Sequence, residues 1–280
     1  MRQRTAILLL LPAAILLTVF LAVPYVTVIT SAFRTPGEGT PFGEGYTLGN
    51  FGRIFSQWYY IGQALNTMLI GAITTLVTLL IALPVAFQLA RPKLFLRGLA
   101  YGIVLSPLLV GIVIRSYGWT ILLGNNGVIN RTLRDWGLID HPLPLMYNTL
   151  GIIIALTHVF LPFMILPIMS AVQGIDPSVP AAARSLGAKR FTVIRRVLLP
   201  LAMPGIQSGC ILVFVLSLSS YVTPALIGGF RVKTTAVTVV DAMLDTFQWP
   251  FGAALALTLA VVGGGTVLIF ARLTRIKWKT

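Results

Sequence analysis

The chain has 280 residues, of which 56% are hydrophobic and only 10% are charged, and its mean hydropathy is +0.90. Soluble domains carry about 25% charged residues, so this composition excludes an ordinary soluble protein and indicates one that resides in lipid. The apolar residues come in long runs separated by short polar stretches. We therefore predict a single membrane domain over residues 1–280, with no soluble catalytic domain.

Six stretches are long and apolar enough to cross a bilayer, which takes about 20 mostly apolar residues. They are Ala6–Ser31, Ile61–Ala90, Leu99–Leu123, Thr149–Val172, Gly205–Gly228 and Phe251–Ala271. The first is too long for the core of a cleavable signal peptide and is expected to be a retained span. Because irregular backbone cannot face lipid, the prediction is an all-α, polytopic membrane protein with six transmembrane helices.

Lys and Arg residues are distributed unevenly between the two sides that these spans would define. One side holds Arg2, Arg4, Arg91, Lys93, Arg97, Arg184, Lys189, Arg190, Arg195, Arg196, Arg272, Arg275, Lys277 and Lys279. The other side holds only Arg34, Arg53, Arg131, Arg134, Arg231 and Lys233. Basic residues concentrate in cytoplasmic loops, so both termini are predicted to be cytoplasmic. The net charge of +14 is therefore explained by the basic residues on the cytoplasmic side and does not indicate nucleic-acid binding.

The cytoplasmic loop at about residues 173–204 carries dense local signals for two short helices. Pro180 suits a first helical turn, three alanines favour propagation, and Gly187 can adopt the left-handed conformation that ends a helix. A second helix is expected next. Its apolar face would consist of Phe191, Ile194 and Val197 or Leu198. Such a basic amphipathic helix can lie on anionic headgroups or dock on a protein, and its residues alone leave both open.

Polar residues inside the spans are candidates for a solute pathway. Arg115, near the outer end of the third span, either lines the pathway or fixes a loop through backbone carbonyls. A polar run before Pro224 indicates a kinked helix whose carbonyls could face a cavity. This run consists of Ser217, Ser219, Ser220, Tyr221 and Thr223.

Other isolated residues have simpler explanations. His158, Gln88 and Asn66 stand alone on apolar helices, where interhelical hydrogen bonding is a commoner role than substrate binding. Cys210 is the single cysteine and is expected to be a buried structural thiol. Gly263–Gly265 would allow close helix approach in the sixth span.

Motifs in the cytoplasmic loop resemble a known family. Ala181-Ala182-Ala183, Gly187-Ala188 and Val197-Leu198-Leu199-Pro200 are similar to the EAA loop of ABC importer permeases. The resemblance implies a type I importer permease fold, in which this helix-turn-helix docks into a groove on the cytoplasmic ATPase. It assigns ATPase coupling to Ala181, Ala182, Ala183, Leu186, Gly187, Ala188, Phe191, Leu199 and Pro200. Ala181 departs from the family, which usually has glutamate there, so the detail of the ATPase contact is expected to differ.

Further motifs extend the resemblance over nearly the whole chain, toward spermidine/putrescine-type permease subunits. They are Ile114–Trp119, Gly127–Asn130, Trp136–Asp140, Leu161–Met164, Tyr221–Gly229 and Trp249–Ala254. The resemblance implies a permease subunit forming half of a pathway for a polyamine, with an amino acid, an opine, aminoethylphosphonate or an iron complex as alternatives. The pathway candidates are Arg115, Tyr117, Trp119, Ser219, Ser220, Tyr221 and Thr223, of which the aromatic side chains offer π faces to an ammonium group.

The resemblance also implies partners and a location. The expected partners are a cytoplasmic ABC ATPase dimer, a second homologous permease, a periplasmic or extracellular substrate-binding protein and membrane lipid. ATP and magnesium would bind the ATPase, and no cofactor, metal or nucleic acid is expected on this chain. The expected location is a bacterial inner (plasma) membrane.

Two other classes of function compete with an importer permease. Proton-coupled secondary transporters usually need intramembrane acids, whereas all seven acidic residues here lie in predicted loops. The chain also shows no inverted repeat, although sodium coupling through backbone carbonyls stays open. An intramembrane enzyme is disfavoured because no cluster of His, Asp, Glu or Cys occurs. The chain contains no phosphate-binding G-x-x-x-x-G-K-[ST] motif, so it is not expected to hydrolyse ATP.

Overall fold

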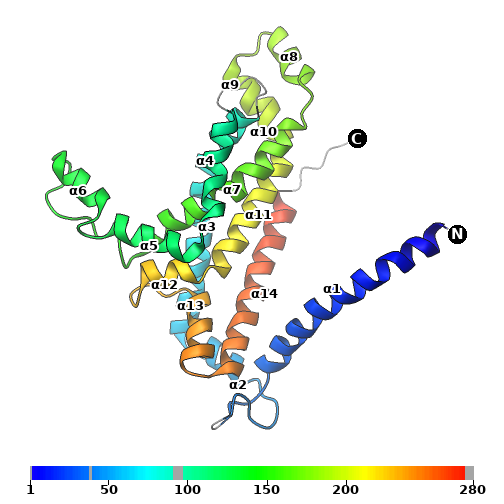
Figure 1. The fold of residues 1–280 in the computed structure, drawn as a ribbon, viewed down its shortest axis with the longest axis vertical. Coiled ribbons are helices and arrows are strands. Elements are labelled where there is room, and N and C mark those ends of the chain that lie inside the picture. Colours follow the sequence, from blue (N-terminus) through cyan, green and yellow to red (C-terminus); the bar gives the residue numbers. More distant parts are fainter. Residues whose placement is uncertain (1, 38–39, 91–96, 275–280) are drawn as a thin grey trace. The chain divides into compact units, whose positions relative to one another are not determined.

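The computed structural model describes residues 2–37, 40–90 and 97–274, which form helices joined by loops (Figure 1). Extended backbone pairs within these ranges at an isolated bridge between Arg34 and Tyr46. The fold is all-α, as predicted from the apolar runs. Several residues used for the topology prediction lie outside the described residues, namely Glu38, Arg91, Lys93, Arg275, Lys277 and Lys279.

The chain packs into two compact units. The first combines the residues up to Gly62 with Thr238–Val262, and the second combines Gln63–Val237 with the residues from Gly263 onward. The helices of the first unit are α1 (Arg2–Ala32), α2 (Gly49–Ser56), the π-helical turn η2 (Asp241–Asp245) and the first part of α14 (Trp249–Leu273). The expected single permease domain remains a prediction.

A small apolar core holds the first unit together. It contains Ala32, Ile54, Ala242, Phe251, Ala253, Ala254 and Leu255. Arg53 of α2 lies over Phe251 of α14, with the guanidinium carbon 4.1 Å from the ring centroid, and donates to Gln248 Oε1 at 2.7 Å. One stacked arginine thus joins α2 to the start of α14.

The second unit contains the rest of the helices. They are α3 (Trp58–Leu89) from Gln63 onward, α4 (Arg97–Leu109), α5 (Ile112–Leu123), α6 (Val128–Asp135), α7 (Thr149–Gln173), α8 (Ser178–Ser185), α9 (Arg190–Val193), η1 (Ile194–Leu198), α10 (Leu199–Leu201), α11 (Met203–Ser219), α12 (Val222–Gly228), the start of α13 (Thr235–Val240) and the end of α14 from Gly263. α7 is the central helix, because it packs against α4, α5, α11 and α12. Its sequence is apolar on every face, which suits a helix buried among other helices.

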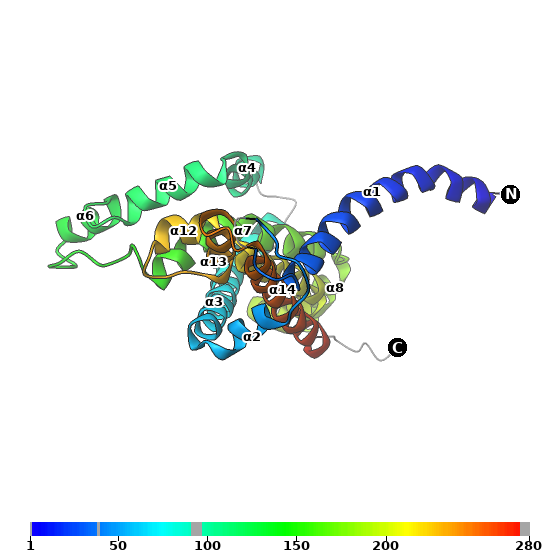
Figure 2. The same cartoon turned by 90° about the horizontal axis from the view of Figure 1, so that it is seen from below.

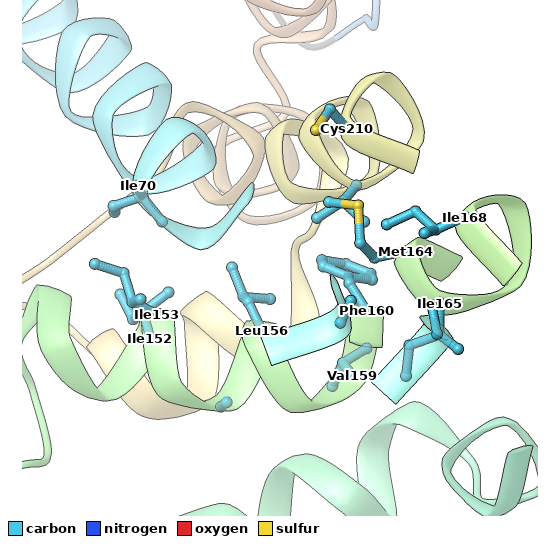
Figure 3. Packing of buried hydrophobic residues seen from close by; sticks show 14 of the residues in the cluster. Ile70, Ile152, Ile153, Leu156, Val159, Phe160, Met164, Ile165, Ile168 and Cys210 are labelled. Atoms are coloured by element: carbon cyan, nitrogen blue, oxygen red, sulfur yellow. The ribbon is translucent and has the colours of Figure 1, made fainter. Parts of the chain in front are cut away.

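Side chains of α7 form the core of this unit with residues of α3 and α11. Figure 3 shows Ile70 of α3 opposite Ile153 and Leu156, and Met164 directed toward the helix that carries Cys210. A Cβ added at Gly209 of α11 would lie 2.7 Å from the Met164 sulfur, so this glycine allows α11 to approach α7 closely. Cys210 is buried, as predicted.

Among the described residues, four helices are long and apolar enough to cross a membrane unbroken. They are α1 over Leu10–Ala32, α3, α7 and α14, and they match the first, second, fourth and sixth predicted spans. Two further crossings are possible if bent pairs of helices are each counted as one span. The structure therefore supports between four and six spans by length and composition.

The third and fifth spans are not the continuous helices that the apolar runs predicted. The third bends by 101° between Gly98–Leu109 and Ile112–Asp135. The fifth begins at Met203, after a 67° bend from Arg190–Leu201, and ends at Ser219, so Val222–Gly228 is the separate helix α12. Pro224 accounts for that second break, because in a continuous helix its ring would clash with the carbonyl of Ser220. The sequence prediction had expected a kink here rather than a complete interruption.

Candidate functional site

The predicted coupling loop begins with α8, at one end of α7 and α11 (Figure 1). Before this helix, Asp176 Oδ1 accepts the backbone N–H of Ser178 at 2.8 Å. This hydrogen bond favours the carboxylate and holds the pKa of the exposed Asp176 below its usual value. Pro180 lies in the first turn of α8, where its missing N–H is not needed, as expected.

Gly187 ends α8 through a Schellman motif. Its φ is +86°, in the left-handed region that glycine adopts without penalty. The Gly187 N–H donates to the Arg184 carbonyl at 2.9 Å, and the Ala188 N–H donates to the Ala183 carbonyl at 3.1 Å. These two bonds satisfy carbonyls at the helix end. The predicted glycine break is confirmed, and the turn is closed by its own backbone.

The second helix of the loop is α9, which continues through the π-helical turn η1 into α10. The Leu199 N–H donates to the Ile194 carbonyl five residues earlier, one residue farther than in an α-helix. Val197 and Leu198 are both half-buried, so the structure does not single out one of them for the apolar face. Phe191 of the predicted apolar face is exposed, whereas Val193, which the prediction did not include, is buried.

Two large apolar side chains of the loop are not buried by any other residue of the described chain. Leu186 is 89% exposed and Phe191 is 72% exposed, and they flank the Gly187 turn. No residue of α8 is buried, so Ala181 and Ala182 also lie on the surface, while Leu199 and Pro200 are half-buried. Exposed apolar side chains on a shaped element are typical of a protein-docking surface.

A second cluster of predicted site residues lies where α5, α7 and α12 meet (Figure 2). The hydroxyls of Ser116 on α5 and Thr223 on α12 are 3.0 Å apart, and both residues are buried. One turn farther along α5, Trp119 Nε1 donates to His158 Nδ1 of α7 at 3.3 Å. His158 thus makes the interhelical hydrogen bond expected for a lone polar residue.

Arg115 binds backbone at the break between α4 and α5. Its Nη2 donates to the carbonyls of Pro107 and Val110, which end the first half of the span. Helix ends leave such carbonyls without intrahelical partners, and a cation suits them because the end of the helix dipole is negative. This geometry matches the loop-fixing alternative for Arg115.

Some of the other pathway candidates are exposed to solvent and others are buried. Tyr117, Ser219 and Tyr221 are exposed, and the Ser219 hydroxyl donates to the Val215 carbonyl of its own helix. Ser220 is buried, and its hydroxyl has no hydrogen-bond partner within the described ranges. The structure therefore brings Trp119 and Thr223 into one junction and leaves the three exposed residues outside it.

α3 carries a buried polar face that was not among the predicted site residues. It is formed by Gln63, Thr67, Thr74 and Thr78, whose spacing of four, seven and four residues places them on one side of a helix. Thr67 Oγ1 accepts the backbone N–H of Thr235 at 2.9 Å. By contrast, Gln88 is exposed and Asn66 is half-buried. Periodicity of polar rather than apolar residues was the signal that could have found this face.

Comparisons with known proteins agree on one family and one fold. A sequence profile described as "Binding-protein-dependent transport system inner membrane component" matches residues 48–274. The chain is 31% identical over 257 residues to the spermidine/putrescine transport system permease protein PotB of Haemophilus influenzae, covering 92% of this chain and 90% of that protein. It is also 31% identical over 260 residues to PotB of Escherichia coli K12, covering 93% and 94%.

A solved structure shares the fold at lower identity. A chain of a bacterial alginate ABC transporter, in complex with an alginate pentasaccharide-bound periplasmic protein, superposes with a TM-score of 0.75. The superposition covers 100% of this chain and 96% of that one, at 19% sequence identity.

Proposed function

The chain belongs to the family of binding-protein-dependent transport system inner membrane components, and on that premise we propose that it carries a small organic polycation, spermidine or putrescine. As a member of this family it is the membrane-embedded permease subunit of an ABC importer. It is a transport component rather than an enzyme, with ATP hydrolysed by a separate subunit.

One observation carries the cargo proposal: the chain aligns over 92% and 93% of its length with two spermidine/putrescine permeases at 31% identity. Charge is compatible with it, because the predicted outer loops carry as many acidic as basic residues and so do not repel a cation. Arg115 keeps its positive charge, but its bonds to the carbonyls of Pro107 and Val110 hold it at the break between α4 and α5.

The coupling loop is the proposed docking element for the ATPase. Support comes from the exposed Leu186 and Phe191 on either side of a turn that its own hydrogen bonds close. With Ala181 in place of the usual glutamate, the contact here relies on apolar burial rather than on a carboxylate. ATP and magnesium belong to the ATPase in this proposal.

The proposal also includes the remaining partners and the orientation in the membrane. We expect a second, homologous permease to form the other half of the pathway and a substrate-binding protein to deliver the cargo. Both termini and the coupling loop face the cytoplasm in this arrangement, as the distribution of Lys and Arg predicts.

Uptake by the reconstituted complex tests the cargo. The complex would contain this chain, its cognate second permease, ATPase and binding protein in proteoliposomes, with labelled spermidine and putrescine as solutes. We expect ATP-dependent uptake that unlabelled polyamines suppress and that an amino acid, an opine, aminoethylphosphonate and an iron complex do not. Uptake of an anionic solute with no polyamine uptake would contradict the cargo and leave the importer function intact.

A further inference from the structure

α5 is joined to its neighbours by few polar contacts. It follows the 101° bend of the third span, and its partners across the junction are α12 and α7. The Ser116–Thr223 hydroxyl pair connects it to α12, and the Trp119–His158 hydrogen bond connects it to α7. Both are side-chain contacts, so α5 can separate from the junction without breaking backbone pairing.

α12, by contrast, is held by a backbone hydrogen bond from the segment just before α7 and by close packing on α7 itself. The Tyr147 N–H donates to the Ile227 carbonyl at 2.8 Å. A Cβ added at Gly228 would lie 2.9 Å from Ile152 Cδ1, so this end of α12 lies directly against α7. Although α5 packs closely on α12, its hydrogen bonds to the junction come from side chains, so movement of α5 would break no backbone hydrogen bond among the described residues.

The chemistry of the Ser116–Thr223 pair suits a contact that opens and closes. Ser116 is 1% exposed and Thr223 is 0% exposed, so the two hydroxyls are desolvated where they meet. Buried Ser and Thr residues on helices can instead donate to a carbonyl four residues earlier, as Ser217 does to Val213 at 2.7 Å. When α5 moves away, Ser116 has such a carbonyl in its own helix at Ile112, so it is not left without a partner.

The position of α5 connects its movement to the solute pathway. α5 begins after a break at one end and carries the pathway candidates Tyr117 and Trp119. The break at Ser220 and Tyr221 precedes α12 in the same way. Two interrupted spans thus meet face to face, in the part of the unit predicted to face outward. Interrupted spans line cavities in membrane proteins, because lipid cannot satisfy their free backbone groups.

We propose that α5 is a gate of the solute pathway, held closed against α12 by the hydroxyl pair of Ser116 and Thr223, and that this pair separates in each transport cycle. The proposal rests on the importer function of the family and not on the identity of the cargo. Ser116 is thereby a gating residue, and Arg115 is a positioning residue that keeps the break at the base of the gate intact.

Reversible cross-linking tests the gate. The variant is Ser116→Cys with Thr223→Cys in a Cys210→Ala background, which removes the single natural cysteine. Hydroxyl oxygens 3.0 Å apart place the paired thiols within reach of a disulfide. In the reconstituted complex we expect oxidation to lower spermidine uptake at least about tenfold and reductant to restore it. Full uptake with the disulfide formed would overturn the proposal.

A second pair in the same unit provides the matched control. The hydroxyls of Thr67 on α3 and Thr235 on α13 are 3.2 Å apart and are also buried, but this contact does not involve α5. Oxidised Thr67→Cys with Thr235→Cys is expected to retain uptake within about twofold. Equal loss in both pairs would contradict α5 as the moving element.

A labelling experiment separates the gate from the cargo. The single variant Ser116→Cys, again with Cys210→Ala, is treated with N-ethylmaleimide at rest and during ATP turnover with the binding protein. We expect labelling to be slow at rest, because position 116 is buried, and several-fold faster during turnover. Equal rates would overturn the gate. If the wild-type complex takes up no spermidine, only the cargo proposal fails, and labelling still decides the gate.

Discussion

Asn130 and Leu143 are joined by two hydrogen bonds between one side chain and one backbone unit. Asn130 Oδ1 accepts the Leu143 N–H at 2.8 Å, and Asn130 Nδ2 donates to the Leu143 carbonyl at 3.0 Å. Nδ2 also donates to the Gly124 carbonyl at 3.1 Å. One buried amide thus connects α6 to the segments before and after it, where little regular structure would hold them.

Replacing this amide should loosen the segment around α6. Asn130→Ala leaves the partly buried Leu143 N–H without a partner, at a cost of about 1 kcal/mol, while the Gly124 and Leu143 carbonyls still accept the backbone N–H groups of Gly127 and Leu145. We expect a lower unfolding midpoint in detergent and faster proteolysis between residues 124 and 143. Asn126→Ala, at an exposed position of the same loop, is the control and should change stability by about 0.5 kcal/mol or less. Equal midpoints for the two variants would contradict this role.

Gly187→Val should uncouple ATP hydrolysis from transport. A Cβ at position 187 meets nothing within 4 Å, so the cost comes from the positive φ of +86° and not from crowding. Assembly should survive or weaken, while transport-coupled ATP hydrolysis is lost. Gly187→Asn, which tolerates this conformation, should retain most activity. Gly174→Ala, at a helical φ of −75°, should be neutral. Normal uptake by a fully assembled Gly187→Val complex would show that the turn is dispensable.

Leu186 and Phe191 should matter for association with the ATPase and not for folding. Both side chains are exposed in the isolated chain, so Leu186→Ala and Phe191→Ala should leave its stability within about 0.5 kcal/mol. A central apolar anchor at an interface is worth about 2 kcal/mol, roughly a 30-fold change in affinity. Co-purification of the ATPase measures this loss. Leu138→Ala, exposed beyond α6, is the control, and undiminished co-purification of both loop variants would argue against docking here.

Arg115→Ala should reduce the amount of folded complex rather than its affinity for cargo. The substitution removes hydrogen bonds from a charged donor to two carbonyls, each worth about 1.5 to 3 kcal/mol. Yield in detergent and the KM for uptake separate the two roles. Arg131→Ala, on the exposed face of α6, is the control. A raised KM with normal yield would make Arg115 part of the pathway.

Reporter fusions should place the coupling loop in the cytoplasm. A reporter near Ser185 is expected to read inside, and reporters near Gly43 and Asp241 outside, because basic residues concentrate on the side that holds Ser185. The fusions near Gly43 and Asp241 serve as controls for each other, since both lie in predicted outer loops. If Ser185 proved extracellular, neither the topology nor ATPase docking at the loop could hold.

The sequence predicted those structural features that are determined within one short segment of the chain. α7 was expected at Thr149–Val172 and spans Thr149–Gln173, because a long apolar run bounded by polar residues determines it. Gly187 was predictable for the same reason, since the turn needs a positive φ at one position. The breaks in the third and fifth spans were not predictable from hydropathy, because both halves of a bent span are equally apolar.

Contacts between segments that are far apart in the sequence could not be predicted from either segment alone. Ser116 and Thr223 meet across 107 residues, and nothing in either segment specifies the other. Thr67 and Thr235 meet across 168 residues in the same way. Such pairs depend on how whole helices pack together, as α5 and α12 do around α7, and not on the sequence of any single helix.

The Schellman turn at Gly187 has a consequence for how the coupling loop could be exchanged. Backbone bonds from Gly187 and Ala188 close the turn, and α8 packs against α9 and η1 of the same loop. The segment that could be exchanged as one unit therefore runs from Asp176 to Pro200. Grafted into a related permease, it would bring its own geometry and, with Leu186 and Phe191, its own apolar contacts to the ATPase.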